Sequence, residues 1–307
     1  MAMIAANGIE ICYEDSGGTG EPLLLVMGLG GQLTDWPAGF VDALIGRGFR
    51  VIRFDNRDIG LSTEFDWPVP SKRQLLAGFV ANRPVEAGYR VPDMAADTAG
   101  LLDALSIDSA HVVGVSMGAM IAQTMGFEHR SKVRSLTSIM SNTGDRRNGR
   151  ADGRVMIRMA RAPRVTRSEA PLVATEMYSM WAGSSWDRAE HLARAERAVA
   201  RSWRPHGVER QTAAIAASPD RTPGLATVTA PTLVIHGLED RLVQPSGGVA
   251  TCEAVPGSRL VLYPDMGHDL PRTRWEEMTD EITVNARRAD GVVSEPVRTL
   301  TVVQPGQ

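Results

Sequence analysis

Short apolar runs alternate with longer stretches of helical periodicity along most of this 307-residue chain. The apolar runs are bounded mostly by Gly, Pro or Asp, and they predict seven strands at residues 9–13, 23–27, 51–54, 111–115, 136–140, 232–235 and 260–262. Between them, apolar side chains recur at helical spacing at residues 93–105, 117–129, 247–254 and 272–288. This alternation predicts an α/β fold with one mostly parallel central sheet flanked by helices.

The alternation stops in the middle of the chain. Residues 145–225 contain no β-branched run and are rich in Arg, Ala, Met and Trp. Prolines divide this segment into short helices, at Pro163, Pro171, Pro205, Pro219 and Pro223. We expect a helical cap inserted into a discontinuous core, which comprises residues 1–144 and 226–290. Residues 291–307 have no clear helical period and are expected to form a C-terminal tail.

Composition and charge exclude several classes of protein. The net charge of −3 gives no field for binding nucleic acid or an anionic membrane. No apolar run approaches the roughly 20 residues of a membrane-spanning helix, and the N-terminal residues do not resemble a signal peptide. We therefore expect a soluble cytoplasmic protein whose two cysteines, Cys12 and Cys252, are reduced and buried. The 15 arginines and 9 acidic residues of 145–225 suggest a basic cap over an acidic core, although solvated helix faces commonly give the same pattern.

A glycine-flanked serine provides the strongest chemical signal. In Gly114-Val115-Ser116-Met117-Gly118, the serine stands between a predicted strand and a predicted helix. A tight strand-to-helix turn requires small residues two positions before and after the serine, and it presents the hydroxyl at the positive end of the helix. Ser116 is therefore the candidate nucleophile. The alternative is a serine that only caps the helix.

A nucleophilic serine needs a histidine base and a carboxylate that orients it. His268 lies on the loop after the last predicted strand and before a helix, which is the favoured place for the base, and His236 at a strand end is the alternative. Asp240 follows the strand at 232–235 and is the candidate acid, with Glu239 as its competitor. The chain order serine, aspartate, histidine is typical of one particular hydrolase fold.

An oxyanion hole requires two N–H donors directed at one point. One donor is expected from Met117, which follows the nucleophile, and the other from Leu29 in the glycine-rich turn after residues 23–27. The same turn also resembles a dinucleotide-binding loop, with Asp55 as a ribose ligand, but Leu33 stands where the third glycine would be. That alternative leaves Ser116, Asp240 and His268 without a common purpose.

These motifs resemble the α/β-hydrolase superfamily over residues 9–288, and within it the aclacinomycin methylesterase-like branch. The resemblance rests on Met27-Gly28, on 53–62 (Arg-Phe-Asp-Asn-Arg-Asp-Ile-Gly-Leu-Ser), on His111-Val112-Val113 leading into the serine turn, and on Met266-Gly267-His268. It implies catalytic roles for Ser116, Asp240 and His268 and oxyanion donors at Leu29 and Met117. Many members of the superfamily have His-Gly where this chain has Met-Gly, a difference that bears on specificity because the backbone is kept. The 55–62 segment is interpreted as a structural turn, and Ser62 as a weaker nucleophile candidate.

The expected reaction is hydrolysis of a carboxylic ester through an acyl-enzyme, with no metal or cofactor. The substrate is expected to be a small, hydrophobic molecule with a medium to large acyl group, for which a polycyclic methyl ester is one candidate. Side chains of the predicted cap are candidates for lining its pocket: Met156, Met159, Met177, Tyr178, Met180, Trp181, Trp186 and Trp203. A lactonase, a carbon–carbon bond hydrolase, a perhydrolase or a ligand-binding receptor on the same scaffold are the alternatives.

Overall fold

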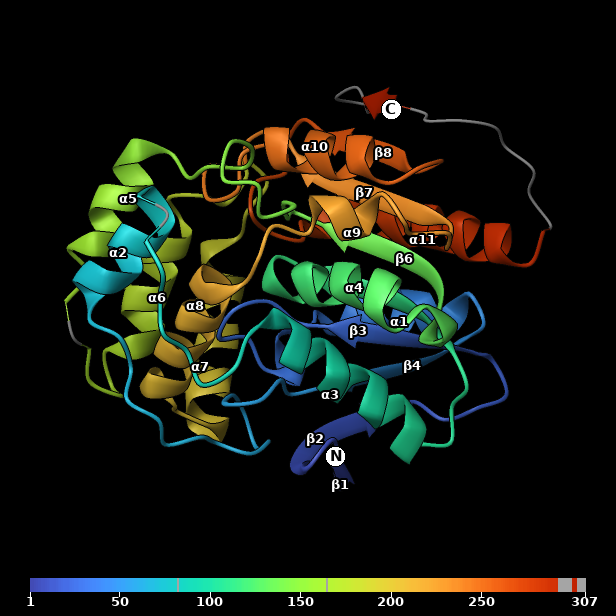
Figure 1. The fold of residues 1–307 in the computed structure, drawn as a ribbon, viewed down its shortest axis with the longest axis horizontal. Coiled ribbons are helices and arrows are strands. Elements are labelled where there is room, and N and C mark those ends of the chain that lie inside the picture. The colour runs from blue at the N-terminus through green and yellow to red at the C-terminus, as the bar shows by residue number, and fades with distance from the viewer. Residues whose placement is uncertain (82, 164, 292–299, 303–307) are drawn as a thin grey trace.

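A single mixed sheet forms the centre of the computed structural model, which describes residues 1–81, 83–163, 165–291 and 300–302. Within these residues its strand order is β1-β2-β4-β3-β5-β6-β7-β8-β9, and all neighbours from β4 to β9 run parallel (Figure 1). The strands are β1 (Ala2–Ala6), β2 (Ile9–Asp15), β3 (Glu21–Val26), β4 (Phe49–Phe54), β5 (Ala110–Val115), β6 (Val133–Ile139), β7 (Thr232–Gly237), β8 (Arg259–Tyr263) and β9 (Leu300–Val302). The predicted α/β fold with a mostly parallel sheet is confirmed.

The two outermost strands were not predicted. β1 is largely exposed and pairs antiparallel with β2 through Asn7 and Gly8, whose φ angles of 49° and 78° suit a tight hairpin turn. β9 pairs with β8 at residues 300–302, within the region expected to be a tail. The rest of that expected tail, residues 292–299 and 303–307, lies outside the described residues.

Helices cover both faces of the sheet. Consecutive residues of β3 point to opposite sides: Leu24 and Val26 join one hydrophobic cluster, and Leu23 and Leu25 join the other. The flanking helices are α1 (Ala38–Gly46), α3 (Val91–Ala104), α4 (Met117–Glu128), α10 (Ser246–Ala254) and α11 (Trp275–Ala289), with short 3₁₀ turns at η1 (Leu33–Asp35), η2 (Arg130–Lys132) and η3 (Arg272–Arg274). The predicted helices are confirmed, and α1 is an addition to them. No helix in the described part of the chain combines the length and apolar character that crossing a bilayer demands.

The segment between β6 and β7 is helical where it is described. It contains α5 (Gly153–Ala160), α6 (Ala170–Tyr178), α7 (Arg188–Arg201), α8 (Pro205–Ala217) and α9 (Thr222–Leu225). Prolines occupy the first turns of α6, α8 and α9, where a missing N–H breaks no helical hydrogen bond. Figure 1 shows α5 to α8 gathered at one end of the sheet, whereas α9 packs on α4 and α10.

A second segment joins this helical layer, and the sequence did not predict it. Helix α2 (Lys72–Ala81) contacts α8, and the Nζ of Lys72 donates to the carbonyl of Ala162, just after α5. Val85, which follows α2 in the chain, packs against Ala213 and Ala216 of α8 in a small buried cluster. The layer over the strand ends is therefore built from two parts of the chain that are far apart in sequence.

Candidate active site

Ser116 stands on a strained turn between β5 and α4. Its φ of 53° and ψ of −118° lie in a region that side chains rarely adopt. A Cβ at Gly114 would collide with the backbone of Gly118, and a Cβ at Gly118 would collide with the carbonyl of Val26. The two glycines therefore permit the turn that exposes the hydroxyl at the start of α4, as their spacing predicted.

The structure brings the three predicted triad residues together. The Oγ of Ser116 lies 2.9 Å from Nε2 of His268, and Nδ1 of His268 lies 2.7 Å from Oδ2 of Asp240. An ionised carboxylate only accepts hydrogen bonds, so Nδ1 carries the proton and Nε2 is free to accept the proton of the serine. Ser116, on the turn after β5, is thus connected through His268, which follows β8, to Asp240, which follows β7.

Asp240 is buried and held in place by its own turn. Its Oδ1 accepts hydrogen bonds from the backbone N–H groups of Leu242 and Val243, at 2.9 and 2.8 Å. Burial acts to raise the pKa of Asp240, but His268 and His236 beside it outweigh that effect and keep the pKa below its ordinary value. The carboxylate is therefore ionised at neutral pH and can stabilise a positively charged imidazole.

The competing residues have other partners. The Glu239 carboxylate accepts a hydrogen bond from the backbone N–H of Ser184. His236 is fully buried behind Asp240, with Nε2 2.7 Å from the carbonyl of Val243 and 3.5 Å from Oδ2 of Asp240. Neither takes part in the hydrogen-bond relay to Ser116.

The proposed oxyanion turn lies directly against the serine. A Cβ at Gly28 would stand 3.2 Å from Cβ of Ser116, so only a glycine allows this approach without displacement. The side-chain amide of Asn56 donates to the carbonyl of Met27 at 3.0 Å and holds the start of the turn in place. Met117 begins α4, where the first N–H groups have no partner within the helix. Leu29 directly follows Gly28 and Met117 directly follows Ser116, and both residues line the same cavity.

The loop that carries His268 is joined to the helical layer, which the sequence did not reveal. The backbone N–H of His268 donates to the carbonyl of Trp181 at 2.7 Å. The buried Oδ1 of Asp269 accepts from the N–H groups of Gly267 at 2.8 Å and Gly183 at 3.1 Å. A side chain on Gly183 would collide with this loop, so the glycine lets the two backbones meet. The orientation of His268 therefore depends on the chain that follows α6.

A cavity of about 1990 Å³ opens above Ser116 and His268 and is bounded by α2 and α5 to α8. Six of the eight predicted cap side chains line it: Met156, Met159, Met177, Tyr178, Trp181 and Trp203. The prediction was wrong for the other two. Met180 lines a separate hollow of about 640 Å³ beside Glu239, and Trp186 packs against the rings of Tyr178 and His191. Among the described residues, no cluster of His, Cys, Asp or Glu is arranged to hold a metal ion.

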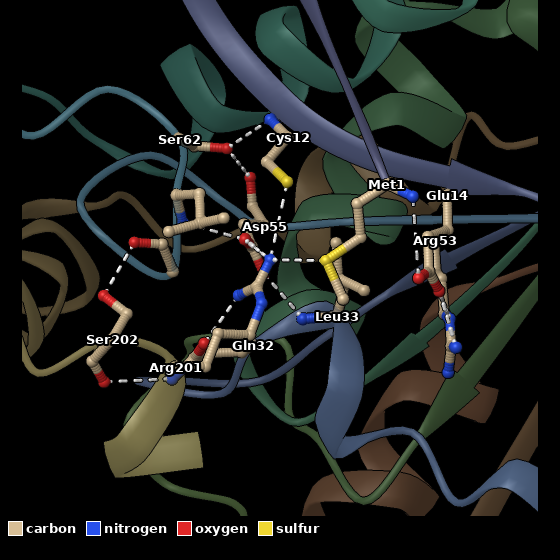
Figure 2. A network of polar contacts seen from close by, with 12 residues as sticks. Met1, Cys12, Glu14, Gln32, Leu33, Arg53, Asp55, Ser62, Arg201 and Ser202 are labelled. Atoms are coloured by element: carbon tan, nitrogen blue, oxygen red, sulfur yellow. Dashed lines mark hydrogen bonds and ion pairs between the residues drawn. The ribbon is translucent and has the colours of Figure 1, made fainter. Parts of the chain in front are cut away.

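Asp55 anchors the helical layer to the core, as Figure 2 shows. Its Oδ1 accepts from the N–H of Leu33 and its Oδ2 from the guanidinium of Arg201, both at 2.7 Å. Ser62 donates to the Asp55 carbonyl and accepts from the N–H of Cys12, so its hydroxyl is not a free nucleophile. Asp55 is fully buried, and these partners exclude the ribose-binding role of the dinucleotide alternative. Both cysteines are buried and unpaired, as expected.

We expect Arg201→Met to destabilise the protein by about 3–5 kcal/mol, because Asp55 would keep a buried charge without its cation. The change is measured as the free energy of unfolding in urea. Arg197→Met is the matched control, since Arg197 is exposed on the same helix, and its effect should stay within about 0.5 kcal/mol. Equal stability of the two variants would contradict the role given to the Asp55–Arg201 pair.

Comparisons with known proteins agree with this architecture. The model of the alpha/beta hydrolase fold family matches residues 21–271. Rhodomycin D methylesterase DauP of Streptomyces sp. is 25% identical, covering 94% of this chain and 98% of the relative. The 2-hydroxy-6-oxononadienedioate/2-hydroxy-6-oxononatrienedioate hydrolase 1 of Dechloromonas aromatica is 26% identical, covering 85% of this chain and 84% of the relative. The solved structure of a thermophilic esterase from Thermogutta terrifontis has a TM-score of 0.68 at 26% identity, covering 94% and 98% of the two chains. The chain belongs to the alpha/beta hydrolase fold family, and it is a hydrolase related to the methylesterase branch.

Proposed function

We propose that this chain is a serine carboxylic-ester hydrolase with Ser116 as nucleophile, His268 as base and Asp240 as the acid that orients the base. The observation that carries the proposal is the unbroken hydrogen-bond relay through these three side chains, at the floor of a large cavity. A serine hydroxyl reacts with an acyl group only when a neutral imidazole removes its proton, and this relay provides that imidazole.

In the proposed mechanism, the Ser116 oxygen attacks the ester carbonyl while its proton passes to Nε2 of His268. The N–H groups of Leu29 and Met117 hold the negatively charged oxygen of the tetrahedral intermediate. Asp240 stays ionised and stabilises the imidazolium. When the intermediate collapses, the carbon–oxygen bond to the alcohol breaks and the alcohol leaves with the proton of His268. Water activated by the same histidine then releases the acid and restores Ser116.

The cavity favours a medium to large hydrophobic ester. Methionine and aromatic side chains of α5, of α6 and of the loops that follow α6 and α7 form part of its wall, and such side chains adapt to bulky apolar groups. We therefore assign residues 145–225 the role of a cap over a core of residues 1–144 and 226–290. The name of the methylesterase relative supports a methyl ester as one form of the substrate.

Carbon–carbon bond hydrolysis is the second candidate, because a relative of similar identity is named for an oxo-dienedioate substrate. The same serine, histidine and aspartate serve both reactions, so the triad alone does not separate them. The shape and polarity of the cavity walls decide which bond lies at Ser116.

The test combines covalent labelling with a panel of substrates. A fluorophosphonate is expected to label the chain once, on the peptide that contains Ser116, as located by mass spectrometry. Turnover of p-nitrophenyl esters is expected to rise from acetate to longer acyl chains, and methyl esters with bulky apolar acyl groups should be hydrolysed. Absence of the label would overturn the ester proposal. Turnover confined to lactones, or to oxo-dienedioates cleaved at a carbon–carbon bond, would also overturn it.

A further inference from the structure

Helix α7 directs one arginine toward the cavity. The residues of α7 that line the cavity follow helical spacing: His191, Arg194, Ala195, Ala198 and Val199. Arg194 is thus a half-buried cation on a face otherwise made of small or uncharged side chains. Holding a cation in such surroundings costs free energy unless an anion compensates it.

Arg194 has no such partner within the described part of the chain, where no hydrogen bond or ion pair reaches its guanidinium. Two other arginines of this helix have carboxylate partners, since Arg188 pairs with Glu176 and Arg201 pairs with Asp55. Arg197 is exposed, so water solvates its charge. Asp35 is close enough for its charge to interact with Arg194, but one of its oxygens is engaged by the N–H of Gln32 at 2.7 Å. Burial also raises the pKa of Asp35, which weakens it as a counter-charge.

The rest of the cavity does not supply the missing anion. Among the described residues that line it, seven are Lys or Arg and three are Asp or Glu. Burial raises the pKa of Asp269, another of these three carboxyls. His191 adds no positive charge, because burial and the neighbouring Arg194 lower its pKa to about 4. The cavity therefore combines apolar walls with an excess of positive charge.

We propose that Arg194 binds a carboxylate on the substrate, so that the preferred esters are acidic, with an apolar chain between the carboxylate and the ester. This inference rests on the proposed function and names the substrate class of the same site. The planar guanidinium offers paired N–H donors that match the two oxygens of a carboxylate. The ester group of the substrate would lie at Ser116 while its carboxylate is bound by Arg194 of α7.

The experiment compares acidic esters with neutral esters of equal length. The acidic substrates are mono-p-nitrophenyl adipate, suberate and sebacate, and the neutral ones are p-nitrophenyl esters of monocarboxylic acids with the same number of chain atoms. We expect the wild type to prefer an acidic ester at one of these lengths. Arg194→Ala should lower kcat/KM for that ester by about 10- to 100-fold, mainly through KM, because a charged hydrogen bond is lost.

Three controls separate binding of the carboxylate from general damage. The neutral ester of the same length should keep its kcat/KM in Arg194→Ala, and Arg194→Lys should recover part of the loss. Arg197→Ala, on the exposed side of α7, should leave both esters unaffected. Calorimetry with free suberate and Ser116→Ala gives a second readout, in which binding is expected to disappear in the double variant with Arg194→Ala.

The outcomes distinguish the two proposals. An equal loss on acidic and neutral esters, or no loss on either, would overturn the role of Arg194 while leaving the ester hydrolase intact. If the wild type hydrolyses no ester, the proposed function fails, and the calorimetric titration still decides whether Arg194 binds a carboxylate. Absence of both ester turnover and suberate binding would overturn both the proposed ester hydrolase function and the proposed role of Arg194.

Discussion

Ser116→Ala should lower kcat for ester hydrolysis on the order of a million-fold, because the nucleophile and its base act as one unit. The oxyanion donors and the cavity remain in this variant, so a small residual rate above that of water is expected. The measurement is the burst and steady-state release of p-nitrophenol from a long-chain ester. Unchanged circular dichroism and thermal unfolding will show that the fold is retained.

Ser62→Ala is the matched control for the nucleophile. Ser62 is as buried as a core residue, and its hydroxyl joins the Asp55 carbonyl to the N–H of Cys12. Its removal should cost about 1–3 kcal/mol of stability and leave kcat unchanged. Full activity in Ser116→Ala, or a larger loss of activity in Ser62→Ala, would refute the assignment of the nucleophile.

His268→Ala should lower kcat by about 10⁴- to 10⁶-fold, because neither the attack nor the departure of the alcohol then has a proton carrier. His268 is the histidine whose Nε2 meets the serine hydroxyl, at 2.9 Å. The measurement is single-turnover acylation and deacylation of a p-nitrophenyl ester, both of which should slow. His129→Ala, at the opposite end of α4 from Ser116, is the control and should retain activity.

His236 is the alternative candidate for the base, and its variant tests the assignment of His268. Its Nε2 faces the carbonyl of Val243 and lies 3.5 Å from Asp240, so it acts on the acid and not on the serine. His236→Ala should therefore retain most turnover. If His236→Ala proved more damaging than His268→Ala, the base would have to be reassigned.

The turn at Ser116 was predictable because its requirements are local. The steric need for Gly114 and Gly118 arises within five residues, and the flanking strand and helix are visible in the apolar pattern. The hairpin at Asn7 and Gly8 had an equally local signal, but the short, exposed strand before it gave no alternation strong enough to predict.

Contacts between distant segments had no such signal. Nothing near Asp55 in the sequence points to Arg201. This buried ion pair forms only when the end of α7 packs on the loop after β4. The same holds for Asp269, whose acceptor oxygen is used by Gly183, 86 positions away. Helix α2 was missed because its side chains are mostly exposed and its apolar periodicity is weak.

The sequence alone determined the α/β fold, the order of its main strands and helices, and the three candidate residues of the hydrogen-bond relay. These depend on short-range periodicity and on glycine at positions where a side chain does not fit. Only the tertiary structure decided which histidine faces Ser116, which carboxylate faces that histidine, and which of the predicted cap side chains line the cavity. It also decided that Arg194 has no counter-ion among the described residues. Those properties depend on distances between segments far apart in the chain, and packing sets those distances.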